Sequence, residues 1–357
     1  MAAPHPEKEL ERLQKSLSDG LPSVAVLTGP AAFFRNEAIE ALIARVPPAA
    51  DLRRIDGSQD SDGRELDDLR GATLFGSGTY LVVRRGEAWL AEHGARLVDI
   101  VPQISKGCGL IVEVAKLDGR TKLTKTITAS GTVFEFRDLY AEPFDRSRSP
   151  LEAELVGWVA MRARKLGMKL TAEAAYLLVS CVGKEPAELH AELSRLALEL
   201  SGKASLGPDA LRGKLTIGFE STPFEFADAV LAKDRKRALR SLEAMFARGV
   251  RGRDGASMDS GGVFPFTVSW LWTAMSNAHA GCALVDEGVR LDDVAARVGV
   301  RTFADRYRAQ VAANRETSLR RGLLLLLEAQ RELRSTGEDP RAILERFVAR
   351  HLGEGGR

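Results

Sequence analysis

Residues 24–46 read VAVLTGPAAFFRNEAIEALIARV and set the topology expected for the N-terminal part of the chain. The apolar run Val24–Leu27 predicts a buried strand, and Thr28-Gly29-Pro30 predicts a sharp turn. Apolar residues then recur at helical spacing between Glu37 and Val46. A strand, a glycine turn and a helix in this order form the frame of a phosphate-binding loop.

The loop itself lacks the residues that bind a nucleotide. The pattern G-x-x-x-x-G-K-[ST] uses its Lys for the phosphates and its hydroxyl for magnesium. Between Gly29 and Glu37 the second Gly, the Lys and the Ser or Thr are all missing, and Pro30 removes one backbone N–H donor. Gly29, Pro30 and Arg35 therefore mark a degenerate loop with no expected cofactor. The alternative is an ordinary strand-to-helix turn of any α/β domain.

The composition excludes several classes of protein. A length of 357 residues predicts two or three domains. The chain has 51 Lys and Arg against 49 Asp and Glu, so it lacks the strongly basic charge of a dedicated DNA-binding protein. Cys108, Cys181 and Cys282 have no metal-ligand spacing, so we expect no metal site and a reducing compartment. We find no secretory signal and no apolar run long enough for a membrane, and we expect a cytoplasmic protein.

Strand and helix patterns alternate up to about residue 143, which predicts a parallel sheet covered by helices. The expected strands are Val24–Leu27, Leu52–Ile55, Tyr80–Val83, Leu110–Val114 and Val133–Phe136. After a Pro-rich break, helical patterns dominate to the end of the chain. Three of them, within 144–213, form a compact group in which Thr171 is the expected N-cap of the second helix. Residues 214–357 are predicted to be helical except for a polar loop at Gly249–Gly262.

The acidic residue that holds magnesium in P-loop ATPases is also missing. It would stand at the end of a neighbouring strand, but Tyr80–Val83 runs into Arg84-Arg85-Gly86. Two separate parts of the site are thus absent, which argues against ATP hydrolysis. The five histidines lie in no recognisable catalytic motif. We expect no catalytic residue and no active site in this chain.

A helical pattern at Arg64–Leu74 places Leu74 and Phe75 away from its inward face. If the helix continues through Gly71, one stripe cannot bury both residues together with Leu66. A Leu-Phe pair at a helix tip suits a pocket on a partner. The alternative is that the helix breaks at Gly71 and both side chains cap the core.

Several segments, in this order, resemble the delta subunit of the bacterial DNA polymerase III clamp loader. Each motif is short, and their order and spacing over nearly the whole chain carry the resemblance. The segments are Val24–Gly29 with its degenerate loop, Thr73–Gly76 followed by Tyr80–Val83, Leu117–Lys125, Gly131–Phe136, and Glu332–Gly337. A departure is Ala72, where some relatives carry a larger apolar residue.

The resemblance implies a RecA-like, AAA+-type domain at 1–143, a three-helix lid at 144–213 and a helical collar at 214–357 that serves oligomerisation. It implies that Leu74 and Phe75 bind the sliding clamp and help to open it for loading onto primed DNA during replication. The partners would be the clamp, the other subunits of a hetero-pentamer and primed DNA. The chain would lack an active site but belong to the DNA-directed DNA polymerase holoenzyme, a nucleotidyltransferase.

A basic cluster of Arg120, Lys122 and Lys125 suits contact with DNA phosphates, with solvated helix positions as the alternative. Two other function classes remain open at this point. One is an active AAA+ ATPase with an unusual phosphate loop. The other is a DNA-binding helical adaptor, which the near-zero net charge disfavours.

Overall fold

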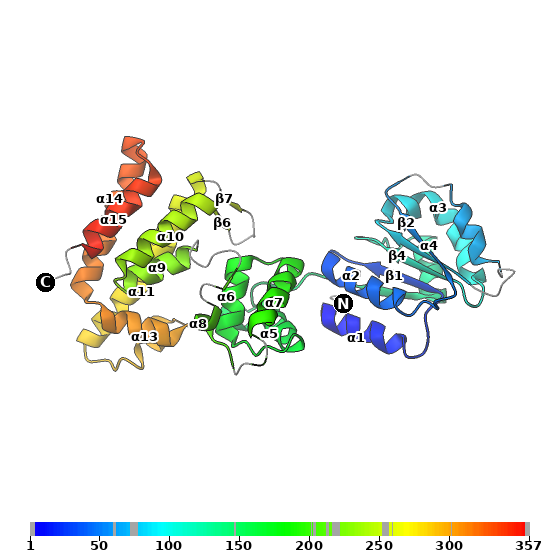
Figure 1. Cartoon of the computed structure of the whole chain (residues 1–357), viewed down its shortest axis with the longest axis horizontal. Helices are drawn as coiled ribbons and strands as arrows, with labels where there is room; N and C mark the ends of the chain where they lie inside the picture. Colours follow the sequence, from blue (N-terminus) through cyan, green and yellow to red (C-terminus); the bar gives the residue numbers. More distant parts are fainter. Residues whose placement is uncertain are drawn as a thin grey trace. The chain divides into compact units, whose positions relative to one another are not determined.

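The computed structural model describes residues 4–59, 62–71, 78–145, 148–200, 202, 205–211, 214–215, 222–251, 257–258, 260–300 and 302–353. By its internal contacts the chain divides into two compact units, Met1–Leu139 and Tyr140–Arg357. The first is an α/β unit and the second is largely helical, so the expected combination of α/β and all-α parts is confirmed (Figure 1). The finer division at residues 143 and 213 stays a prediction.

The first unit is built on a five-stranded sheet of order β2-β3-β4-β1-β5, in which every pairing is parallel. Val26 of β1 lies opposite Val112 of β4 on one side and Val133 of β5 on the other. The three inner strands are buried along almost their whole length, as expected for apolar runs covered on both faces. The strands are β1 (Val24–Thr28), β2 (Asp51–Asp56), β3 (Thr79–Arg84), β4 (Gly109–Glu113) and β5 (Thr132–Glu135).

Helices cover both faces of this sheet. Figure 1 shows α1 and α2 on one side and α3 and α4 on the other. The core under α3 and α4 contains Trp89, Leu97, Leu123 and Ile127, together with Leu66. The helices are α1 (Pro6–Ser16), α2 (Ala32–Ile43), α3 (Glu87–Ile100) and α4 (Lys122–Ser130), with short 3-10 helices η1 (Arg64–Leu69) and η2 (Val101–Gln103).

The helix predicted over Arg64–Leu74 is wrong in type and in length. The chain forms the 3-10 helix η1, which ends at Leu69, and Gly71 is not helical. Leu66 and Leu69 are both fully buried. Residues three apart lie on the same side of a 3-10 helix and also share a face of an α-helix. The spacing of Leu66 and Leu69 therefore did not distinguish a 3-10 helix from an α-helix.

The second unit begins with a group of three longer helices. Thr171 is the N-cap of the second of them, as predicted, because its hydroxyl accepts a hydrogen bond of 3.2 Å from the backbone N–H of Ala174. The elements are η3 (Pro150–Glu152), α5 (Glu154–Lys165), α6 (Ala172–Val182), α7 (Pro186–Leu200) and the one-turn α8 (Pro208–Leu211).

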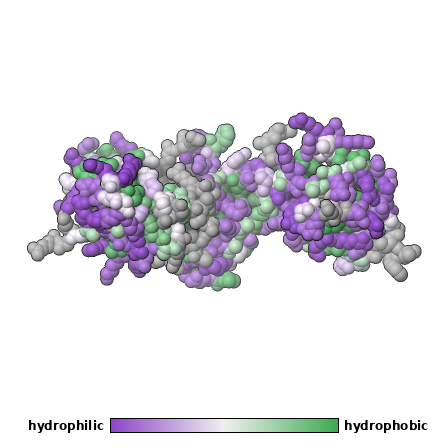
Figure 2. Space-filling view, turned by 90° about the horizontal axis from the view of Figure 1, so that it is seen from above, coloured by the Kyte–Doolittle hydropathy of each residue, from purple (hydrophilic) through white to green (hydrophobic). Residues whose placement is uncertain are grey.

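The remaining helices share one large apolar core, which includes Phe226, Leu242, Met275, Leu326 and Phe347. Across the helices of the described residues, the structure contains none that is long and apolar enough to cross a membrane. In Figure 2, hydrophilic residues cover most of the visible surface and hydrophobic residues show between them in small groups. The helices are α9 (Pro223–Leu231), α10 (Arg235–Arg248), α11 (Ser260–Asp286), α12 (Val294–Val298), α13 (Ala304–Ala313), α14 (Glu316–Thr336) and α15 (Pro340–Leu352).

The loop predicted at Gly249–Gly262 is only partly a loop. Val250–Arg251 (β6) and Ser257–Met258 (β7) pair as a short antiparallel ribbon, and α11 already begins at Ser260. Pro265 lies inside this helix. The buried side chains of Val263 and Phe264 explain the earlier start, because both join the core of this unit.

Candidate functional site

The degenerate loop uses its own backbone donors within the fold. The N–H of Gly29 donates to the carbonyl oxygen of Ala115 at 3.1 Å, and the N–H of Ala31 donates to that of Phe136 at 3.1 Å. Pro30, between them, has no N–H. The three residues that begin the loop therefore offer no backbone donor to a phosphate.

Gly29 is held in a conformation that other residues avoid. Its φ is +107°, and a Cβ atom at this position would lie 2.2 Å from the carbonyl oxygen of Phe136. The glycine of the loop thus serves the close approach between the loop and the segment after β5. It keeps the turn of a phosphate-binding loop while its surroundings are filled by protein.

Arg35 stands where the pattern of a working loop has its lysine, and its side chain points inward. Its Nε lies 3.0 Å from the Oε1 of Glu113, and a further guanidinium N–H donates to the carbonyl oxygen of Gly29. Arg35 and Glu113 are 7% and 8% exposed. A cation on α2 and an anion at the end of β4 thus form a buried ion pair beside the loop.

The two arginines expected at the end of β3 are present at this edge of the sheet. Arg84 lies 3.8 Å from the second carboxylate oxygen of Glu113 and donates to the side-chain oxygen of Asn36. Asn36 stands at the hydroxyl position of the loop pattern. An amide therefore stands at the hydroxyl position of the loop pattern, while the strand next to β1 is β4, which ends in the carboxylate of Glu113.

Arg85 pairs with Asp56 at the end of β2 and has a φ of +52°, a strained value for a residue with a side chain. The pKa of Asp56 is lowered, mainly because its carboxylate accepts hydrogen bonds from the hydroxyl and backbone N–H of Ser58, with a smaller effect of Arg85. This carboxylate is held by its neighbours at the edge of the sheet. It is not placed next to the degenerate loop.

Leu74 and Phe75, the expected clamp-binding pair, lie outside the described residues, as does Ala72. The chain on both sides of them is described and is held by one turn, Ser105–Cys108. Ser105 donates from its N–H to the carbonyl of Leu69 at 2.9 Å and from its hydroxyl to that of Arg70 at 2.8 Å.

On the other side, the N–H of Thr79 donates to the Sγ of Cys108 at 3.3 Å. The same turn approaches Gly78 so closely that a Cβ atom there would lie 1.7 Å from the carbonyl oxygen of Gly107. The two ends of the Leu74–Phe75 segment are thus fixed to a common base. Sequence patterns did not identify Ser105 or Cys108, because neither belongs to a recognisable motif.

The structure brings Arg120, Lys122 and Lys125 together at the start of α4, and all three are exposed. Thr121 caps this helix by accepting the N–H of Thr124 at 3.1 Å. Lys122 and Lys125 are three residues apart and so share one face of the helix. Cations in a first turn are unfavourable with the helix dipole, which makes this end of α4 suited to an anionic partner.

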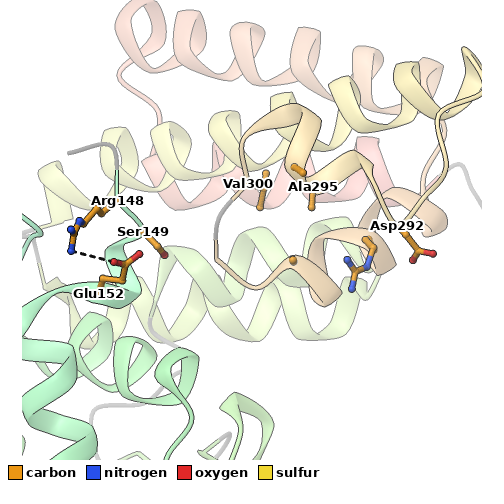
Figure 3. Close-up of a pocket in the computed structure, with 9 residues that line it drawn as sticks. Arg148, Ser149, Glu152, Asp292, Ala295 and Val300 are labelled. Atoms are coloured by element: carbon orange, nitrogen blue, oxygen red, sulfur yellow. Dashed lines mark ion pairs between the residues drawn. The ribbon is translucent and has the colours of Figure 1, made fainter. Parts of the chain in front are cut away.

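The second unit contains a separate hollow of about 620 Å³ between the segment 148–152 and the region 292–308. Figure 3 shows Arg148 and Glu152 on one side of it, paired at 3.7 Å, with Ala295 and Val300 on the other. It contains none of the site residues predicted from the sequence. Its mixed lining indicates no particular chemistry.

In the described part of the chain, no group of three or more His, Cys, Asp or Glu side chains is suited to a metal ion. The pKa of His190 is lowered by burial and by Arg162, whose Nε donates to the ring at 3.3 Å. This histidine therefore interacts with an arginine of the same helical unit.

Comparisons with known proteins find similarity in structure alone. No protein-family model and no curated protein sequence matches the chain. The structure is similar to the Bacillus subtilis DNA clamp loader delta protein (YqeN), with a TM-score of 0.50 and 15% identity, over 98% of this chain and 100% of that one. The Thermotoga maritima RuvB Holliday junction branch migration motor matches at a TM-score of 0.37 and 13% identity, over 84% of this chain and 83% of that one.

The match to the delta protein confirms the delta-like clamp-loader fold expected from the sequence. At 15% identity the comparison concerns the fold alone.

Proposed function

We propose that this chain is a non-hydrolysing, delta-type subunit of a DNA polymerase III clamp loader. It binds the sliding clamp and holds it open for loading onto primed DNA during replication. One observation carries the proposal: within a delta-like fold, Arg35 and Glu113 fill the nucleotide site with a buried ion pair. A subunit with such a site acts through protein contacts, and ATP-driven sister subunits of a hetero-pentamer supply the energy.

The three predicted domains then have separate tasks. The RecA-like domain at 1–143 carries the clamp contact, the three-helix lid at 144–213 connects it, and the collar at 214–357 joins the sister subunits. The chain works without a cofactor, in the cytoplasm, as a member of the DNA-directed DNA polymerase holoenzyme. The transferase activity belongs to the holoenzyme and not to this subunit.

Leu74 and Phe75 are the proposed clamp contacts. Burial of two such side chains in a pocket of the clamp contributes about 1.5–3 kcal/mol each, the scale of an interface hot spot. The hydrogen bonds from Ser105 and to Cys108 support this placement, because a segment with fixed ends loses less conformational entropy when it binds.

Arg120, Lys122 and Lys125 are proposed to contact phosphates of primed DNA within the assembled complex. Their exposure and their common position at the start of α4 support this role. Three cations alone contribute few phosphate contacts. We therefore propose that they help to position DNA that other subunits also bind.

The test is the affinity of the purified chain for the sliding clamp, measured by surface plasmon resonance. The double variant Leu74→Ala with Phe75→Ala is expected to bind about 10²–10⁴-fold more weakly, because the buried area of both side chains is lost. The matched control is Phe144→Ala with Leu198→Ala, which removes the same two side-chain types from exposed positions. Equal affinity of the wild type and the first double variant would refute the proposed contact, and ATP turnover by the chain alone would refute its non-hydrolysing role.

A further inference from the structure

A groove runs between α3 and the segment that leads into α4, on one face of the first unit. Its volume is about 590 Å³. We name it the α3–α4 groove. Its apolar lining comes from one side of α3, from α4 and from the segment that leads into α4, namely Leu90, Ala91, Gly94, Ala95, Val98, Leu117 and Leu123.

The α3 side of the groove is formed by small residues near its middle. Ala91 and Ala95 are exposed and Gly94 is half-buried. A Cβ atom at Gly94 would meet only the Cδ2 of Leu123, at 3.6 Å, which is ordinary contact. Nothing in the described fold therefore requires glycine in the middle of this helix, where it lowers helix stability. The missing side chain of Gly94 leaves the floor of the groove open.

The two walls of the groove are joined at one end. The carboxylate of Glu87, in the first turn of α3, accepts the backbone N–H of Ala115 at 2.5 Å. On the opposite wall, the backbone N–H of Arg120 donates to the Asp118 carboxylate at 3.0 Å. Hydrogen bonds of this kind hold the groove in shape before any partner arrives.

The α4 wall carries cations that have no anionic partner among the described residues. Lys116 and Lys122 line the groove and are exposed, and neither forms an ion pair there. Arg120 and Lys125 add positive charge close by, while Asp118 is the carboxylate of this wall. An anionic flank of a partner would be attracted to this side.

We propose that the α3–α4 groove docks an amphipathic helix of a partner protein, with its apolar face on Gly94 and its carboxylates along the α4 wall. Small residues allow the backbone of a second helix to approach closely, and the apolar floor suits helix-in-groove recognition. The lining contains no aromatic side chain on which a nucleotide base would stack, so a helix fits this groove better than single-stranded DNA. This inference is independent of the clamp contact at Leu74 and Phe75. Lys122 is shared with the proposed DNA contact, so the helix and DNA would compete for this lysine.

The experiment uses the full chain and two labelled synthetic helical peptides with the same apolar stripe. One carries Glu along a flank, and the other carries Gln at the same positions. Fluorescence anisotropy is expected to show tighter binding of the Glu peptide, and Lys116→Gln with Lys122→Gln is expected to weaken it by about two- to fivefold per lysine. The affinity of the Gln peptide is expected to stay unchanged in that variant.

Gly94→Leu fills the floor and is expected to weaken both peptides about tenfold or more, the loss that follows when one apolar side chain can no longer be buried. Its melting temperature is expected to stay equal or rise, because a helix-forming residue replaces glycine. The control Gly157→Leu changes an exposed glycine of α5 with no neighbour within 4 Å of its Cβ position, and peptide binding should be unaffected. Ala95→Gln, at an exposed position of α3, gives a second filled groove.

Peptide binding that is indifferent to both Gly94→Leu and Ala95→Gln would overturn the proposal. A second outcome would also overturn it. If Gly94→Leu weakened the binding of duplex DNA as much as it weakened the binding of peptide, the groove would be a nucleic-acid site.

Discussion

The substitution Glu113→Gln is expected to destabilise the first unit by about 3–5 kcal/mol, because it leaves the buried guanidinium of Arg35 without its anion. The two groups lie 3.0 Å apart. At an effective dielectric constant of about 20, unit charges at this distance attract each other by about 5–6 kcal/mol. Glutamine keeps the shape and an acceptor but loses the charge, and the carbonyl of Gly29 still accepts from Arg35. These remaining contacts place the expected loss below the full Coulomb energy.

The assay is hydrogen exchange of the amides of β1 and β4 in the full chain, because a chain of two units need not unfold in one step. Where exchange reports opening of the whole unit, a loss of 3–5 kcal/mol accelerates it by about 10²–10⁴-fold. The matched control is Asp51→Asn in β2. Its partner Arg53 has a side chain that is 43% exposed, and such surface pairs contribute less than about 1 kcal/mol.

A double variant separates the charge from the packing. Arg35→Met with Glu113→Met removes both charges and keeps similar volumes, so most of the stability lost in Glu113→Gln should return. If Glu113→Gln accelerates exchange no more than Asp51→Asn does, the ion pair does not stabilise the closed loop. The Arg35–Glu113 pair would then not be what closes the loop.

Three further outcomes follow from single residues. Burial, with a contribution from Arg321, lowers the pKa of His351 to about 4. The free energy of unfolding should therefore fall by up to about 3 kcal/mol as the pH drops from 6.5 to 4, because the unfolded chain binds the proton first. Urea titrations of the variant His351→Gln should lack this loss. Burial raises the pKa of Cys181 to about 12, so iodoacetamide at pH 8 should label it in urea and leave it unmodified in the native chain, as mass spectrometry would show. Gly29→Ala places a Cβ atom 2.2 Å from the carbonyl oxygen of Phe136, and exchange of β1 amides should reveal a loss of at least about 2 kcal/mol.

Much of the first unit could be predicted from local pattern. Buried parallel strands are apolar along their whole length, so runs such as Val24–Leu27 and Tyr80–Val83 were recognisable without tertiary information. The absence of an acidic residue after Val83 was equally visible. Both features depend on residues that are close in sequence.

The ion pair that fills the site could not be predicted in this way. Arg35 and Glu113 are 78 residues apart, and their meeting depends on β4 lying next to β1 in the sheet. A signal was present, since Glu113 interrupts an otherwise apolar strand and a charge in such a position needs a partner. The partner could be named only once the strand order was known.

The prediction of an α-helix at Arg64–Leu74, where the structure has the 3-10 helix η1, was wrong for a different reason. The pattern of apolar residues at Leu66 and Leu69 fits either kind of helix, and the carbonyl of Leu69, where η1 ends, accepts a tertiary hydrogen bond from Ser105. A local pattern cannot report a bond to a turn that lies far along the chain. The loop predicted at Gly249–Gly262 shows the same limit, because Val263 and Phe264 pack into the core and α11 begins before them, at Ser260.

A sealed site changes how such a subunit can be controlled. A ligand shifts a conformational equilibrium only by as much as its affinities for the two states differ. In the first unit, the buried side chains of Arg35 and Glu113 pair with each other beside the loop, so under the proposed function nucleotide exerts no differential affinity there. Any change in the presentation of the segment between Gly71 and Gly78 must then come from contacts outside this loop. In the proposed assembly these contacts are made by the sister subunits and the clamp. A conformational change that depends on neighbouring proteins can therefore control a subunit that does not itself hydrolyse ATP.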